Sequence, residues 1–216
     1  MSHYEDEAQV EQLRRWWREN WMALAGGLVI GLAGIFGWEA WQNARTSKAE
    51  HASQVYEDLK KASPDKKDRI DELWQQLGTE YASTPYAAQG ALLIASQDAL
   101  KQDWAGAQQK LEWVVAHGDD AGLQKLAKLR LARVLWQLAK ADEALALLDI
   151  ADNDAFAALY QELRGDIQLS KGDRAAAKAA YDKALQLGPA TANKDPLQRK
   201  IDDLKNEAAK IEPVKS

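Results

Sequence analysis

The chain has no cysteine, and histidine is scarce, with three residues among 216. Without cysteine no disulfide can form, and no thiolate can act as a nucleophile or a metal ligand. The histidines His3, His51 and His117 lie too far apart in the sequence to suggest a shared metal site. The segment from Gly165 to Gly172 also lacks the spacing of a phosphate-binding loop. We therefore predict no catalytic, cofactor-binding or metal-binding residues, and a protein that is not an enzyme.

Proline is rare, with 5 residues, and runs of β-branched residues are nearly absent. Ala, Leu, Gln, Glu and Lys are abundant instead, and this composition favours α-helix almost throughout. The net charge is −5, yet beyond residue 41 basic and acidic residues nearly balance, 25 against 27. A domain with that balance lacks the basic surface of a nucleic-acid-binding protein. We predict an all-α protein with no nucleic-acid partner.

The longest apolar run covers residues 21–38, which include no charged side chain. As an α-helix it would be about 27 Å long, close to the ~30 Å hydrocarbon core of a bilayer. Five of the nine tryptophans lie at its two ends, as is typical of membrane interfaces: Trp16, Trp17, Trp21, Trp38 and Trp41. We predict a single transmembrane helix over residues 21–41, and not a buried helix of a soluble protein.

A cleaved signal peptide fits this run less well. The residues before it are many and acidic, and the run is longer than the apolar region of a typical signal peptide. The residues after it, Glu39 to Gln42, lack the small-x-small pattern that a signal peptidase requires. We therefore expect the run to remain in the chain as an anchor in the lipid bilayer.

Basic residues around the span indicate its orientation. Three arginines precede it closely and two basic residues follow it: Arg14, Arg15, Arg18, Arg45 and Lys48. Cytoplasmic flanks of membrane helices are enriched in Lys and Arg. We therefore expect residues 1–20 to form a cytoplasmic leader and the rest of the chain to lie across the membrane.

Small residues recur along one side of the predicted membrane helix. Gly27 and Gly31 form a GxxxG pair, and Ala23 and Gly34 lie on the same stripe. Such a stripe lets a second helix approach closely, so these four residues are candidates for packing against a partner helix. Glycine is also frequent in membrane helices in general, and the pattern alone does not separate the two interpretations.

Helical periodicity continues through residues 42–216. The patterns predict four helix pairs and a C-terminal capping helix: 48–62, 66–82, 85–101, 104–116, 122–139, 141–151, 155–170, 173–187 and 196–211. Residues 42–62 would form a stalk and the first repeat helix, residues 63–211 the repeat domain, and residues 212–216 a tail. No Gly or Pro lies between Trp38 and Lys61, so the membrane helix can continue into the first repeat helix.

The spacing within the pairs is that of degenerate tetratricopeptide-like repeats. Residues 172–189 carry six positions of that pattern: Gly172, Ala177, Tyr181, Ala184, Leu185 and Pro189. Shifts of 33 and then 37 residues bring Ala144 and Ala107 onto the position of Ala177. Three residues depart from the apolar pattern, namely Asp98, Arg164 and Gln168. An ordinary helical bundle remains the alternative to an α-solenoid.

The predicted helix 122–139 has two apolar arcs. The arc that contains Leu131 and Leu135 is predicted to be core, whereas Leu126, Leu129 and Trp136 lie on the opposite arc. In tetratricopeptide repeats this second arc faces a concave groove suited to a peptide or a partner helix. Matching positions of the neighbouring helices complete the candidate groove: Leu92, Leu100, Leu126, Leu129, Arg133, Trp136, Glu162 and Leu169.

Two tryptophans carry separate expectations. Trp136 packs under the terminal helix if it does not line the groove. Trp113 lies off the apolar face of its helix, which Leu111, Val114 and Val115 define. We therefore expect Trp113 to be unburied and to offer a second contact point.

The order of these segments resembles that of the YfgM family of ancillary SecYEG translocon subunits. The residues that carry the resemblance most are Arg14 to Trp17 and Trp21 to Trp41, although it covers the whole chain. The resemblance implies a bacterial inner-membrane protein with periplasmic repeats. It further implies association with the SecYEG translocon and with PpiD, a membrane-anchored periplasmic chaperone, and a role in helping newly translocated, still unfolded proteins reach folding factors.

Two other functions remain open at this point. One is an anchored regulator that sequesters a signalling or stress-response protein, which a groove specific for one folded partner would favour. The other is an anchored hydrolase, which would require polar residues that converge in a pocket.

Overall fold

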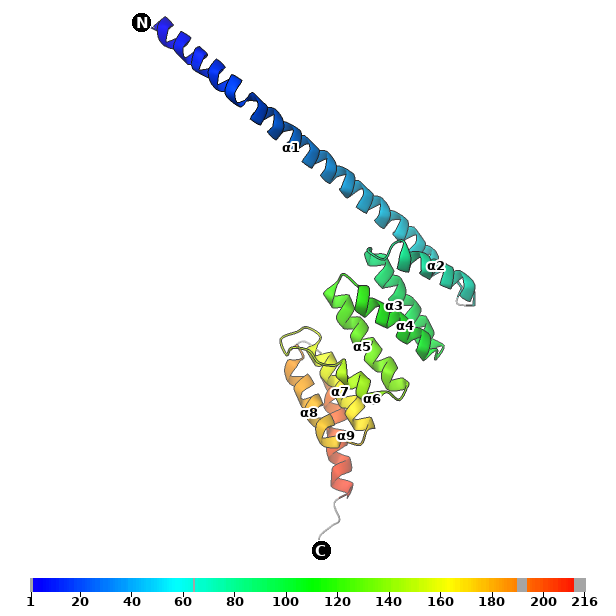
Figure 1. The fold of residues 1–216 in the computed structure, drawn as a ribbon. Helices are drawn as coiled ribbons and strands as arrows, with labels where there is room; N and C mark the ends of the chain where they lie inside the picture. The colour runs from blue at the N-terminus through cyan, green and yellow to red at the C-terminus, as the bar shows by residue number, and fades with distance from the viewer. Residues whose placement is uncertain (1, 64, 190–193, 212–216) are drawn as a thin grey trace. The chain divides into compact units, whose positions relative to one another are not determined.

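The computed structural model describes residues 2–63, 65–189 and 194–211, and these residues form nine α-helices (Figure 1). No strand occurs in these ranges, so the prediction of an all-α protein is confirmed. In chain order the helices are α1 (Ser2–Lys61), α2 (Lys67–Thr79), α3 (Pro85–Leu100), α4 (Trp104–His117), α5 (Ala121–Gln137), α6 (Ala141–Ala146), α7 (Ala157–Ser170), α8 (Arg174–Leu187) and α9 (Asp195–Ile211).

The chain divides into two units, residues 1–50 and residues 51–216. The first unit consists of α1 up to Glu50. Within the described residues, α1 is the one helix long and apolar enough to cross a membrane, and none of its apolar window is buried. The tryptophans at both ends of the apolar segment, such as Trp17 and Trp38, are exposed as well. A core helix of a soluble protein would be largely covered, so this exposure favours the predicted anchor.

The helix α1 continues without a break to Lys61, as the absence of Gly and Pro predicts. Its last residues belong to the second unit. There Ala52 and Leu59 are buried in one cluster with Leu73 of α2 and Ile94 of α3. The end of α1 therefore serves as the first helix of the repeat domain.

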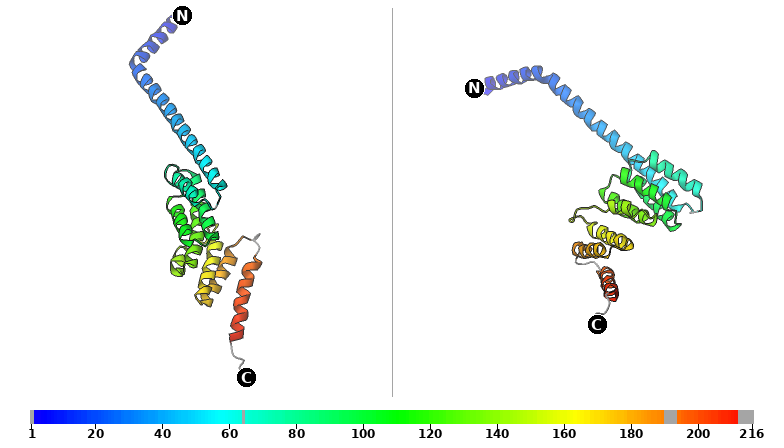
Figure 2. Two further views of the ribbon diagram at one scale, coloured as in Figure 1. Left: turned by 90° about the vertical axis from the view of Figure 1, so that its right-hand side faces the viewer. Right: turned by 60° about the horizontal axis from the view of Figure 1, so that its bottom comes forward.

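Within the second unit, consecutive helices pack as pairs: α3 with α4, α5 with α6, and α7 with α8. The helix α4 also packs on α5, and α5 contacts both α3 and α7, so that each pair stacks on the next (Figure 2). The helix α9 packs on α8 and ends the stack. This arrangement is that of an α-solenoid, in which each repeat contacts its neighbours.

Three clusters of buried apolar side chains hold the stack together. The largest spans α3 to α7 and includes Leu111, Leu135 and Tyr160. A second joins the end of α1 to α2 and α3, and a third joins α8 to α9 through Tyr181 and Ile201. Because the largest cluster crosses several repeats, the interior helices are covered on more than one side.

Aspartates cap the N-termini of several helices of the stack. Asp103, Asp120 and Asp173 each accept a hydrogen bond from a backbone N–H of the first turn, at 3.0, 2.6 and 2.9 Å. These bonds satisfy donors that have no partner within the helix. Gly172 precedes Asp173 with φ of +84°, a left-handed conformation that glycine adopts without strain.

The helix predicted at 141–151 is the clearest error in the element boundaries. The helix α6 ends at Ala146, and the chain turns at Leu147 and Leu148. The Arg164 guanidinium of α7 donates a hydrogen bond to the Leu148 carbonyl, 2.6 Å away. It thereby satisfies a backbone acceptor that the short helix leaves free, and this contact explains why a polar residue interrupts the repeat pattern at position 164.

Candidate protein-binding site

The helix α5 lies in the middle of the stack and carries half of the predicted groove residues. Its core arc is buried as predicted, including Leu131 and Leu135. Leu129, however, is only 2% exposed, and Leu92 of α3 is only 7% exposed. Both belong to the central cluster. The prediction that these two leucines face an open groove is wrong.

The reason lies in the stacking of the repeats. A helix of an isolated pair needs one apolar arc, whereas an interior helix of a stack packs on the next repeat as well. Tyr160 and the segment before α7 fix α7 to α5: the Tyr160 hydroxyl donates to the Lys125 carbonyl at 2.7 Å, and Lys125 forms an ion pair with Asp154. The second apolar arc of α5 is thus largely inter-repeat core.

Trp136 and Trp113 are also more enclosed than predicted. Trp136 is half-buried against the central cluster, and its indole N–H donates a hydrogen bond to the Ser170 hydroxyl at the end of α7, 2.9 Å away. Trp113 is half-buried too, with its ring edge-on to Trp74 at 5.1 Å and stacked on His117 at 4.9 Å. Trp113 is therefore less exposed than expected, and its role as a second contact point stays a prediction.

Part of the predicted groove on α7 is occupied by α9. Lys200 of α9 forms ion pairs with Glu162 at 2.9 Å and with Asp166 at 2.7 Å. Burial disfavours the charged ammonium, but the hydrogen bonds to Asp166 and Glu162 outweigh it, so the pKa of Lys200 lies above its ordinary value. Leu169 packs against the cluster that joins α8 to α9. Glu162 therefore contacts the capping helix α9.

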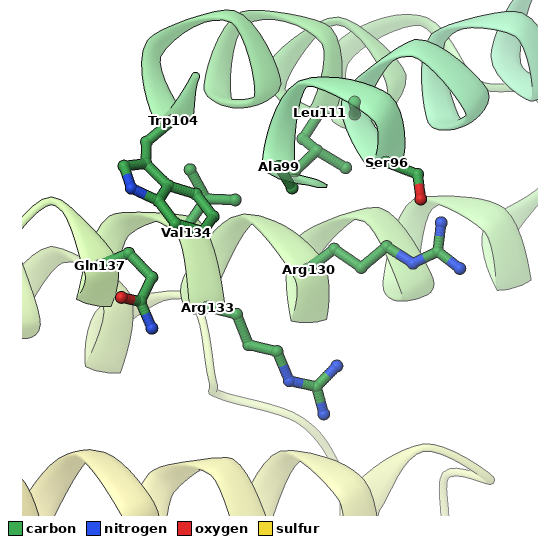
Figure 3. A pocket seen from close by; sticks show the side chains of 9 residues that line it. Ser96, Ala99, Trp104, Leu111, Arg130, Arg133, Val134 and Gln137 are labelled. Atoms are coloured by element: carbon green, nitrogen blue, oxygen red, sulfur yellow. The ribbon is translucent and has the colours of Figure 1, made fainter. Parts of the chain in front are cut away.

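The remaining candidates are Leu126, which is half-buried, Arg133, which is exposed, and Leu100, which is 84% exposed at the end of α3. Arg133 lines a pocket between α3, α4 and α5, of about 320 Å³, which we term the α3–α5 pocket (Figure 3). Its lining residues are Ala95, Ser96, Ala99, Trp104, Leu111, Arg130, Arg133, Val134 and Gln137.

The α3–α5 pocket has an apolar interior and a cationic end. Ala95 and Ala99 of α3 leave space that a larger side chain would fill, and Trp104 lies over Val134 (Figure 3). The Arg130 and Arg133 side chains extend from α5 in the direction away from Trp104 (Figure 3). A pocket of this kind can accept an apolar side chain and an anionic group together.

The groove prediction misses Trp104, the residue that closes one end of the pocket. It is the first residue of α4, directly after the Asp103 cap. A large apolar residue at the first position of a helix lies outside the periodic stripe that predicts core residues. That isolation is the feature of the sequence that could have identified it.

The similarity to known proteins covers the apolar helix and the repeats alike. The family model of the tetratricopeptide repeat-like domain matches residues 14–206. The chain is 33% identical over 205 residues to the ancillary SecYEG translocon subunit of Escherichia coli (strain K12), which is 94% of this chain and 99% of that protein. It is 32% identical over 184 residues to the protein of that name from Haemophilus influenzae, 85% of this chain and 90% of the relative. With the relative from Neisseria gonorrhoeae the identity is 28% over 207 residues, 94% of this chain and 99% of the relative.

The chain belongs to the family of ancillary SecYEG translocon subunits. The resemblance based on Arg14 to Trp17 and Trp21 to Trp41 is thereby confirmed, and so is the tetratricopeptide-like fold. The family model matches the apolar helix and the repeats of this chain together, because the match begins at residue 14.

The small residues of the apolar helix are not covered by any other described part of the first unit. Ala23, Gly27, Gly31 and Gly34 are all exposed on α1. A Cβ atom placed on any of these three glycines would meet no atom within 4 Å. The stripe is therefore free to pack against another helix, and a specific helix partner remains a prediction.

Another, polar pocket lies between the start of α2, the end of α3 and the start of α4, and it includes Asp98 and Asp103. Burial raises the pKa of the Asp98 carboxyl above its ordinary value, and the negative charge of Asp103 adds to the effect. In the described residues, no group of three or more His, Cys, Asp or Glu is placed to hold a metal ion.

Proposed function

We propose that this family member is a membrane-anchored, non-catalytic adaptor that binds the SecYEG translocon and presents its repeat domain on the periplasmic side of the bacterial inner membrane. One observation carries the proposal. A single helix, α1, contains both the uncovered apolar segment and residues buried in the first repeat. The chain thus joins an anchor to a protein-binding repeat fold without a separate linker domain.

The proposal that this chain acts at the translocon is based on its relatives. Their shared name refers to the SecYEG translocon, and the relative from Escherichia coli is similar to this chain over 94% of the chain's length. We further propose that the repeat domain binds a PpiD-type membrane-anchored chaperone or newly translocated, unfolded chains, and so assists their folding. The apolar interior of the α3–α5 pocket supports this part, because extended chains and partner helices bind through apolar side chains.

Photocrosslinking in intact membranes tests the proposal. A photoreactive residue at Ser96 or Gln137, both exposed at the rim of the α3–α5 pocket, should form crosslinks to a translocon subunit, to the chaperone or to a chain in transit. The same probe at Glu112, which is exposed on α4 outside the pocket lining, is the matched control. Crosslinks to a single folded signalling or stress-response protein would instead support an anchored regulator.

A further inference from the structure

We propose that the α3–α5 pocket binds an acidic segment of a partner protein. One bulky apolar side chain of that segment enters the pocket, and neighbouring Asp or Glu side chains pair with Arg130 and Arg133. The inference rests on the proposed function, because it gives the chemistry of the partner that the adaptor holds.

The two arginines differ from other basic residues of the stack. Lys125 and Lys200 reach from one helix to carboxylates on or next to α7 and form ion pairs there. Within the described part of the chain, neither Arg130 nor Arg133 has an ion-pair or hydrogen-bond partner. Two guanidinium groups beside an apolar pocket therefore keep their full capacity to donate hydrogen bonds to an anion.

The position of the arginines favours one acidic segment over scattered anions. They are three residues apart on α5, so their side chains leave the same face of the helix. Both side chains extend away from Trp104, Arg130 toward Ser96 and Arg133 away from α3 and α4 (Figure 3), and both residues line the pocket. The residues that line the pocket include no Asp or Glu, so an acidic ligand meets no like charge there, and each guanidinium can bind a carboxylate through two parallel hydrogen bonds.

The size of the pocket limits which apolar side chains of the partner segment can enter it. Its volume of about 320 Å³ is at the lower end of the range for ligand sites. That space suits one or two side chains and is too small to enclose a folded element. The alanines at 95 and 99 together with Leu111, Val134 and Trp104 form an apolar lining, which matches a Leu, Phe or Trp of the incoming segment.

Peptide binding to the full-length protein in detergent micelles tests the inference. The probe is a short fluorescein-labelled peptide in which one Leu is flanked by Glu on both sides, and its counterpart has Gln in place of Glu. The acidic peptide should bind about tenfold more tightly than the Gln peptide, as expected for hydrogen bonds between charged groups. The preference should diminish at high salt, because exposed charges are screened.

Matched variants test whether Arg130 and Arg133 cause the preference for the acidic peptide. Arg130→Gln/Arg133→Gln should remove the preference for the acidic peptide and leave the weak binding of the Gln peptide unchanged. Arg199→Gln, an arginine exposed on α9, should leave the preference intact. Arg130→Glu/Arg133→Glu should reverse it in favour of a peptide with Lys in place of Glu, and unchanged melting curves would exclude misfolding. Equal binding of the acidic and Gln peptides to the wild-type protein would overturn the inference.

The two proposals fail in different ways. If crosslinks at Ser96 and Gln137 reach the translocon or its chaperone but peptides show no charge preference, the adaptor function stands and the acidic partner is wrong. If the crosslinks join two copies of this chain, or capture lipid only, the pocket is not a partner site and the inference falls with it.

Discussion

Gly165 lies where two helices of a repeat, α7 and α8, approach closely. A Cβ atom at this position of α7 would lie 2.3 Å from Cε1 of Tyr181 on α8. Both residues are buried, and the Tyr181 hydroxyl is fixed by donating to Asp166 at 2.8 Å. Gly165→Ala should therefore lower the free energy of unfolding by about 2 kcal/mol or more, the upper part of the range for overpacked cores. Thermal unfolding followed by circular dichroism measures the loss.

Gly78→Ala is the matched control for that prediction. Its Cβ would lie 3.3 Å from the ring of Trp74, which is half-buried and can move slightly. Alanine is also favoured over glycine inside a helix by about 1 kcal/mol, so the net change at this site should be small. Equal losses in the two variants would show that the contact with Tyr181 does not limit position 165.

Asp98 makes stability depend on pH. Because its pKa is raised in the folded state by burial and by Asp103, the folded chain binds a proton at this site more tightly than the unfolded chain does. Stability is thus higher once the carboxyl is protonated and falls as pH rises through the folded pKa. Asp98→Asn removes the charge, so it should raise the melting temperature at pH 7. This increase in melting temperature should become smaller as the pH approaches the ordinary pKa of Asp, about 4.

A comparison with Asp182→Asn separates this effect from a general change in net charge. Asp182 pairs with Lys178 one turn away on α8, and both side chains are close to half exposed. Its removal should leave the melting temperature at pH 7 unchanged or slightly lower. A gain for Asp98→Asn that is equally large at pH 7 and pH 4 would contradict the role of ionisation.

At the scale of elements, α9 is held to the stack by apolar contacts, by the ion pairs of Lys200 and by a hydrogen bond from the Arg174 guanidinium to the Leu204 carbonyl. Ile201 and Leu204 are buried against α8, and Lys200 lies between Glu162 and Asp166. Lys200→Met would leave two carboxylates near each other without the ammonium. Since all three side chains are partly exposed, we expect the free energy of unfolding to fall by about 1 kcal/mol. The decrease should be smaller at high salt.

Thermal unfolding and protease cleavage within α9 measure this loss. The lysine contributes stability below its unfolded pKa, and the contribution disappears as pH rises through the raised folded pKa. The difference between wild type and Lys200→Met should therefore vanish in strongly alkaline solution. Lys178→Met, which breaks only a pair within α8, should cost less than about 0.5 kcal/mol.

The elements of the stack could be predicted from the sequence because local features define them. Pro85 is the first residue of α3 and Asp173 is the N-cap of α8, and apolar spacing identifies buried residues such as Leu131 and Leu135. The end of α6 could not be predicted, since it depends on Arg164, which is distant in sequence and satisfies the Leu148 carbonyl. A boundary set by a tertiary hydrogen bond leaves no local pattern.

The binding surface could be predicted only in part, for a related reason. The periodicity of α5 reveals two apolar arcs but not what covers each of them. Leu129 faces the next repeat and is buried, whereas Arg133 of the same arc is exposed at the α3–α5 pocket. Trp104, which completes that pocket, comes from another helix. Contacts between repeats decide these placements, and no single helix encodes them.

At the scale of the whole molecule, the orientation of α1 decides where the pocket is found. Arg14, Arg15 and Arg18 precede the apolar segment, and the repeat domain follows it. The excess of arginines before the segment predicts a cytoplasmic N-terminus. Because the chain has no cysteine, a single introduced thiol reports its own location without interference.

Ala116→Cys provides that thiol on the repeat domain, since Ala116 is exposed on α4. Ser170 is a less suitable position for the thiol, because its hydroxyl accepts the hydrogen bond from the Trp136 indole. An impermeant maleimide should label Ala116→Cys in right-side-out inner-membrane vesicles and only weakly in inverted ones. Val10→Cys, exposed before the arginines, should show the opposite pattern. If Ala116→Cys reacts only in inverted vesicles, the α3–α5 pocket faces the cytoplasm, where it can meet neither a periplasmic chaperone nor a chain that has crossed the membrane.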